Sequence, residues 1–129
     1  AQVLKTRTLK AHNQVGYGGE YHAKSSVPSA VLSVGYGDGL HRSLCHKVLQ
    51  LGLGGRMLPS KILGRVSMDL TVVSLEGFVR QKIPTKVGEW VILLGGNSTQ
   101  GIEMAENANT IIYEILTSIS ARVPRIYIK

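Results

Sequence analysis

The sequence of 129 residues has one cysteine, few aromatic residues and no long hydrophobic run. A single cysteine, Cys45, excludes an internal disulfide framework and any zinc cluster built from cysteines, which fits the reducing conditions of the cytoplasm. No run of about 18 apolar residues is present, so we expect no transmembrane helix and no membrane partner. With 43% hydrophobic and 18% charged residues, the composition also argues against intrinsic disorder.

The chain is basic, with a formal net charge of +7, and the excess lies in its first half. Residues 1–65 hold nine basic and two acidic residues, whereas residues 66–129 hold six of each. A basic half is typical of proteins that bind nucleic acid, and a small nucleic-acid-binding β-barrel is one interpretation. Aromatic residues form only 5% of the chain, however, and the tyrosines lie in turns, which disfavours base stacking. We therefore expect no nucleic-acid partner.

Short apolar segments separated by frequent turns predict a mostly β domain. Glycine makes up 15 of the 129 residues and separates segments that indicate strands at 29–34, 70–75, 89–94 and 126–128. Many short strands at this spacing are typical of a closed or nearly closed barrel, here expected to be small and Greek-key-like. Residues 1–129 are expected to form one domain.

Helical periodicity is confined to the C-terminal end of the chain. Residues 99–107 predict one short amphipathic helix, and Asn109 or Thr110 can cap a second. Pro124 stops any helix beyond that point. The second helix is expected to pack through one apolar stripe, which consists of Ile111, Ile112, Ile115, Leu116 and Ile119.

Most candidate functional residues have an ordinary structural alternative. His41 and His46 have no helix to bring them together and no obvious third ligand, so no metal site is expected. Tyr17 and Tyr36 are each flanked by glycines. Such glycines are typical of tight turns, or they clear space for a phenol that meets an approaching ligand.

A series of motifs follows in order along almost the whole chain: Val15-Gly16-Tyr17-Gly18, Val34-Gly35-Tyr36-Gly37-Asp38-Gly39, Gly64-Arg65-Val66-Ser67-Met68-Asp69, Val87-Gly88-Glu89, Asn109-Thr110-Ile111-Ile112-Tyr113-Glu114 and Arg122-Val123-Pro124-Arg125. Together they resemble the C-terminal domain of the alanine racemase family. The resemblance implies a pyridoxal-phosphate enzyme in which an N-terminal (β/α)8 barrel carries the cofactor lysine and most cofactor contacts. That barrel has no counterpart in this chain, which also begins without methionine inside an expected strand. We therefore expect a piece of a longer protein.

The resemblance also implies a role for individual residues. Tyr17 matches the catalytic base that reaches across the family's homodimer interface, and Tyr113 matches the tyrosine that binds the cofactor phosphate. The backbone N–H of Met68 matches a contact with the substrate carboxylate, and Tyr36 matches a neighbouring substrate-binding position. Three further residues match the corridor through which a small amino acid reaches the cofactor: Arg42, Arg65 and Asp69.

The activity implied by the resemblance is the interconversion of L- and D-alanine, which supplies bacterial peptidoglycan precursors in the cytoplasm. Because the cofactor lysine belongs to the missing barrel, the 129-residue chain alone is expected to be inactive. Leu40 stands where many relatives carry an aromatic residue, so serine is an alternative substrate. A decarboxylase of basic amino acids would need a cysteine in the cross-subunit loop, and Cys45 lies outside the matching loops.

The resemblance changes the interpretation of the charge. The basic first half carries Tyr17, Tyr36, Arg42 and Arg65, and it ends just before Met68. We interpret its charge as one side of an active site that meets an anionic cofactor and a substrate carboxylate.

Overall fold

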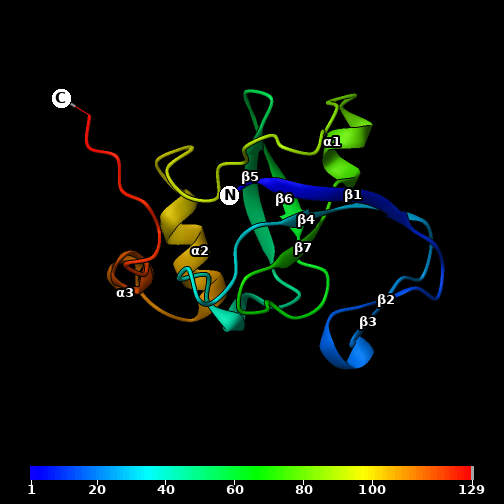
Figure 1. Ribbon diagram of the computed structural model, residues 1–129, viewed down its shortest axis with the longest axis horizontal. Coiled ribbons are helices and arrows are strands. Elements are labelled where there is room, and N and C mark those ends of the chain that lie inside the picture. The colour runs from blue at the N-terminus through cyan, green and yellow to red at the C-terminus, as the bar shows by residue number, and fades with distance from the viewer. Residues whose placement is uncertain (129) are drawn as a thin grey trace.

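A computed structural model describes residues 1–128, and of Tyr17 it describes the backbone alone. The β structure consists of three small antiparallel sheets, two of which lie at the centre of the molecule (Figure 1). The largest has the order β1-β4-β7 and consists of β1 (Val3–Leu9), β4 (Val27–Leu32) and β7 (Thr71–Ser74). Because β4 pairs with both neighbours, this sheet joins the start of the chain to its middle.

Two hairpins complete the β structure. Strands β5 (Val48–Leu53) and β6 (Arg56–Lys61) are joined by Gly54 and Gly55, whose φ angles of 58° and 72° suit a tight two-residue turn. Strands β2 (Gln14–Val15) and β3 (Tyr21–His22) form a shorter hairpin. The 3-10 turn η1 (Tyr17–Gly19) lies between these two short strands.

The helices cover two ends of the β structure. Helices α2 (Gln100–Ala108) and α3 (Ile112–Ser118) pack together at one end, and the β2–β3 hairpin projects at the opposite end (Figure 1). The short helix α1 (Glu76–Arg80) follows β7 and packs on β4 and β6. The 3-10 turn η2 (Arg42–Leu44) packs against α2. No helix in the described part of the chain is both long and apolar enough to cross a bilayer.

Two hydrophobic clusters hold this arrangement together. The larger lies between the sheets and the helices, and its most deeply buried side chains include Val3, Leu32, Leu44, Ile62 and Phe78. The smaller lies at the β2–β3 hairpin and consists of Leu9, Val15, Ala23, Val27 and Leu63. The hairpin that carries Tyr17 is therefore anchored by a cluster of its own.

The expected mostly β architecture is confirmed, but the barrel is not closed. The predicted strands at 29–34 and 70–75 correspond to β4 and β7. These strands pair in register from Ser29 opposite Ser74 to Leu32 opposite Thr71. Between this sheet and β6 the ladder is reduced to an isolated bridge, Ile62 with Val73, so the sheets remain separate.

The strands predicted at 89–94 and 126–128 are wrong. Trp90 bridges to Gln2, whereas Ile92 bridges to Gly52 on β5. Since neighbouring residues pair with two different partners, neither ladder extends into a strand. Residues 126–128 lie outside the sheets, and their side chains are 87–92% exposed.

The helix predicted at 99–107 is confirmed as α2, and the second predicted helix as α3, but the capping differs. Asn109 ends α2 in the left-handed region, with φ 57°, and Ile111 precedes the first residue of α3. Only part of the expected stripe is inside: Ile115 is buried, whereas Ile111 and Leu116 are exposed. Helix α1 was not expected, because five residues carry little helical periodicity.

Phe78 provides a test of the main core. Its side chain is fully buried in α1, whereas the adjacent Val79 is 57% exposed. We expect Phe78→Ala to lower the free energy of unfolding by about 3–5 kcal/mol, because it leaves a cavity. Val79→Ala is the matched control and is expected to change it by less than about 0.5 kcal/mol. Urea denaturation measures both, and equal effects would contradict this description of the core.

Candidate functional site

A cavity of about 370 Å³ opens beside the loop that follows β4 and the loop that precedes β7. It brings together the five residues to which the resemblance gives a substrate-binding or corridor position. The lining consists of Tyr36, Arg42, Arg65, Val66, Ser67, Met68, Asp69 and Leu70. The two loops thus meet at one place, although their roles there stay predictions.

The loops at 35–39 and 67–70 approach each other so closely that only glycine fits at one position. A Cβ on Gly35 would collide with the Ser67 carbonyl oxygen and with the Met68 backbone. Two backbone hydrogen bonds close the gap: the Tyr36 N–H donates to the Ser67 carbonyl at 2.9 Å, and the Gly37 N–H donates to the Met68 carbonyl at 2.9 Å. The cavity wall is therefore built from hydrogen-bonded backbone at this point.

These bonds also fix the direction of the Met68 N–H. A trans peptide places its N–H and C=O on opposite sides, so the Met68 N–H points away from the Tyr36 backbone. Among the residues that the structure describes, this N–H donates no hydrogen bond. Met68 is 51% exposed and lines the cavity. A backbone donor is thus available there to a ligand with an oxygen acceptor.

Arg42 gives the cavity a positive charge. Its guanidinium carbon lies 5.7 Å from the centroid of the Tyr36 ring, a distance at which a cation and an aromatic face attract each other. Within the described part of the chain, no carboxylate forms an ion pair with Arg42. Together with the Met68 N–H, this charge suits a small anion such as a carboxylate.

Arg65 is tied to the segment that carries Tyr17. It donates a hydrogen bond to Glu20, directly after η1, and Glu20 Oε2 lies 4.0 Å from His46 Nε2. The hydrogen bond from Arg65 lowers the pKa of the Glu20 carboxyl and raises the pKa of the Arg65 guanidinium. The ion pair therefore holds the Tyr17 segment against the cavity wall.

The two tyrosines with the most specific predicted roles are placed differently. Tyr17 belongs to η1, and its side chain lies outside the described residues. The preceding Gly16 lies close to the cavity wall, because a Cβ on Gly16 would lie 3.3 Å from the backbone nitrogen of Arg65. Tyr113 is 72% exposed on α3, beside Ile102 and residues 110–112, and does not line the cavity. The structure therefore does not bring Tyr113 to Met68.

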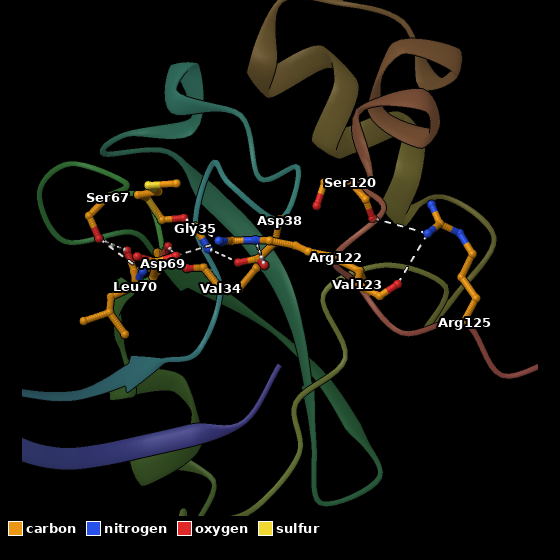
Figure 2. Close-up of polar contacts among 12 residues, drawn as sticks. Val34, Gly35, Asp38, Ser67, Asp69, Leu70, Ser120, Arg122, Val123 and Arg125 are labelled. Carbon is orange, nitrogen blue, oxygen red and sulfur yellow. Dashed lines mark hydrogen bonds and ion pairs between the residues drawn. The ribbon is translucent and has the colours of Figure 1, made fainter.

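The sequence prediction missed Arg122 as a residue of this region (Figure 2). Its Nε donates to Asp38 Oδ1 at 2.9 Å, and its Nη2 donates to Asp69 Oδ1 at 2.8 Å and to the Met68 carbonyl at 3.2 Å. The hydrogen bonds to Asp38 and Asp69 raise the pKa of the Arg122 guanidinium. Arg122 belongs to the motif Arg122-Val123-Pro124-Arg125, but no sequence pattern indicates that it pairs with Asp38 and Asp69, which lie far away along the chain.

The basic residues of the first half do not all gather at the cavity. Arg42 and Arg65 line it, whereas the other seven are spread elsewhere, for example Lys5 and Arg7 on β1 and Lys61 on β6. The site therefore accounts for only part of the charge. No group of three or more potential metal ligands is found among the described residues.

Comparison with known proteins agrees with the series of motifs. A family model described as "Alanine racemase, C-terminal domain" matches residues 1–127. The alanine racemase of Hahella chejuensis is 34% identical over 128 residues, which are 99% of this chain and 32% of that protein. The alanine racemase of Desulfosudis oleivorans is 37% identical over 98% of this chain and 31% of that protein. The chain thus spans about a third of these relatives.

Solved structures show the same likeness in three dimensions. Alanine racemase from Bartonella henselae, solved with covalently bound pyridoxal phosphate, superposes with a TM-score of 0.84 at 33% identity. The match covers 99% of this chain and 34% of that one. Alanine racemase from Streptomyces lavendulae also gives a TM-score of 0.84, at 30% identity, over 100% of this chain and 32% of that one.

The Glu20–Arg65 pair predicts a pH-dependent contact. Because the folded protein lowers the pKa of Glu20, the stabilisation is complete above the ordinary glutamate pKa of about 4.3 and is lost as the pH falls through the lowered value. We expect backbone amides of residues 16–20 to lose protection from hydrogen exchange in that acid range. Glu20→Gln should remove this pH dependence, and a Glu76→Gln control should keep it. Unchanged protection in the wild type would contradict the assignment.

Proposed function

Since the chain belongs to the alanine racemase C-terminal domain family, we propose that it supplies the substrate-carboxylate side of a pyridoxal-phosphate-dependent alanine racemase. The observation that carries the proposal is the cavity, where the Met68 N–H and Arg42 meet beside Tyr36. Alanine is a small zwitterion, and its carboxylate needs a hydrogen-bond donor and a positive charge. The cavity offers both.

The residues present fit the outer contacts of pyridoxal phosphate. The exposed phenol of Tyr113 suits a hydrogen bond to its phosphate group, whereas none of the described cavity-lining residues is a lysine. The cofactor lysine is accordingly assigned to the N-terminal barrel of the longer protein. When bound, the cofactor withdraws electrons from the substrate and so makes its Cα proton easier to remove.

Tyr17 is the proposed base and acid for one face of the substrate. Its Oη would take or return the Cα proton there, while a barrel group serves the opposite face, as inversion of the centre requires. A free phenol has a pKa of about 10, so a base near neutral pH needs neighbours that stabilise the phenolate. Support for this role comes from the segment of Tyr17, which Glu20 ties to the cationic Arg65.

The remaining side chains act on access and orientation. Arg42 attracts the substrate carboxylate and stacks on Tyr36, which limits the width of the approach. Asp69 is held by Arg122, so its negative charge is partly neutralised where the substrate passes. These contacts favour a small amino acid with an uncharged side chain, and alanine is proposed over serine because the relatives that the chain matches are alanine racemases.

The wider setting is proposed from the family. The parent protein would be a homodimer in which Tyr17 completes the partner subunit's active site. It would work in the bacterial cytoplasm, where D-alanine enters peptidoglycan precursors. Neither nucleic acid nor a membrane is a proposed partner.

The catalytic role of Tyr17 is tested in the full-length parent. Tyr17→Phe removes the proton-carrying oxygen and is expected to lower kcat for L-alanine about 10²–10⁴-fold. Tyr21→Phe is the matched control, because Tyr21 packs against the cluster at the β2–β3 hairpin, and it should retain activity. D-Alanine formation is measured by chiral chromatography, with L-serine as the competing substrate. Activity retained in Tyr17→Phe would overturn the role, and faster turnover of serine would change the substrate.

The isolated chain provides a second test. With added pyridoxal phosphate, residues 1–129 alone are expected to show no racemisation above the rate of the cofactor in buffer, because the cofactor lysine is assigned to the barrel. Deuterium incorporation at Cα of alanine, followed by NMR, detects even slow proton exchange. Protein-dependent exchange at Cα would contradict the assignment of that lysine.

A further inference from the structure

The proposed function uses Arg122 only as the counter-ion of Asp69, yet Arg122 joins both loops of the cavity (Figure 2). We propose that Arg122 is a positioning residue that fixes the Met68 N–H for the substrate carboxylate and neutralises two carboxylates beside it. This inference rests on the proposed function, because it assigns Arg122 to the carboxylate contact of that site.

The contacts of Arg122 use the shape of the guanidinium. Its Nε donates to Asp38 Oδ1, and its Nη2 donates to both Asp69 Oδ1 and the Met68 carbonyl. A planar group with several donors in fixed directions can hold three acceptors at once, whereas a lysine ammonium acts as a point charge. One side chain therefore sets the spacing between the 35–39 loop and the 67–70 loop.

Asp38 extends this link to the base of its own loop. Its second oxygen, Oδ2, accepts a hydrogen bond from the Gly35 N–H at 2.9 Å. The Asp38 side chain is only 22% exposed, so water competes weakly for it. Arg122, Asp38 and Gly35 thus form a continuous chain of hydrogen bonds that ends where the two loops are closest.

Met68 is held through the peptide on each side of it. The Ser67 carbonyl accepts from the Tyr36 N–H, and the Met68 carbonyl accepts from both the Gly37 N–H and Arg122. Since each peptide is planar, fixing the two carbonyls leaves the Met68 N–H one direction. Loss of Arg122 removes one of the bonds that hold this geometry.

Charge acts in the same direction. Asp38 and Asp69 both lie within 3 Å of the guanidinium, at 2.9 and 2.8 Å. Asp69 lines the cavity, so without Arg122 its charge would repel a substrate carboxylate. Arg122 therefore supports anion binding twice, by holding a donor in place and by neutralising its acidic neighbours.

The experiment uses the full-length parent with Arg122→Lys and Arg122→Met. We expect both to raise KM for L-alanine by about tenfold or more, the effect of losing one charge-assisted hydrogen bond, with kcat within about threefold. Arg125→Gln is the matched control: Arg125 lies on the same segment and donates only to described backbone carbonyls, those of Ile119, Ser120 and Val123. Its KM should stay near the wild-type value. If Arg122→Met fails to fold, the KM of Arg122→Lys alone decides whether Arg122 has the proposed role.

A second measurement does not require turnover. Protein labelled with ¹⁵N-methionine is titrated with acetate as a carboxylate probe, and the Met68 amide is assigned with Met68→Leu. In the wild type, the Met68 amide signal should shift on titration while those of Met57 and Met104 do not. The Arg122 variants should weaken acetate binding by about the same factor as KM.

The outcomes separate the two proposals. If the wild-type parent has no racemase activity, the proposed function is wrong. The acetate titration would still decide the role of Arg122. Unchanged acetate affinity and KM in a folded Arg122→Lys variant would overturn the inference. In a double-variant cycle, the effects of Arg122→Lys and Asp38→Asn on KM should be non-additive, because both changes break the same hydrogen bond between Arg122 and Asp38. Additive effects on KM would also contradict the proposed role of Arg122.

Discussion

The close contact between the 35–39 loop and the 67–70 loop is the constraint on which the site depends. Gly35 must lack a side chain for the loops to meet, and the meeting sets the peptide of Met68. The loop contact continues the β4–β7 ladder, which ends at the pair Leu32 and Thr71. From this last pair, Thr71 Oγ1 donates to the carbonyl of Val34, next to Gly35, at 2.7 Å. The sheet thus determines where the loops leave, and backbone contact determines the wall of the cavity.

Sequence patterns predicted the parts of the fold that depend on local interactions. Residues 29–34 and 70–75 became β4 and β7, since their apolar pattern suits strands that are mostly buried. The segment at 89–94 has a similar pattern, but its pairing depends on two distant partners, Gln2 and Gly52, which no local pattern records. Closure of the barrel failed as a prediction for the same reason.

The candidate site was predictable where motifs carry it and hidden where it depends on distant pairs. Tyr36, Arg42 and Met68 were identified by resemblance, and the structure brings them to one cavity. The partners of Arg122 lie 53 and 84 residues away along the chain, and the ion pair of Glu20 with Arg65 spans 45. Such pairs depend on the fold as a whole, so composition and spacing do not reveal them.

The place of Arg122 along the chain has a consequence for biosynthesis. The ladder and both loops are complete by Leu75, whereas the counter-ion of Asp38 and Asp69 follows only after α3. The residues of both loops are therefore synthesised before the arginine that joins them. A nascent chain that has emerged only as far as α2 carries both loops, but Asp38 and Asp69 still lack their ion-pair partner Arg122. The contacts that Arg122 makes with the two loops can therefore form only after the chain has extended beyond α3.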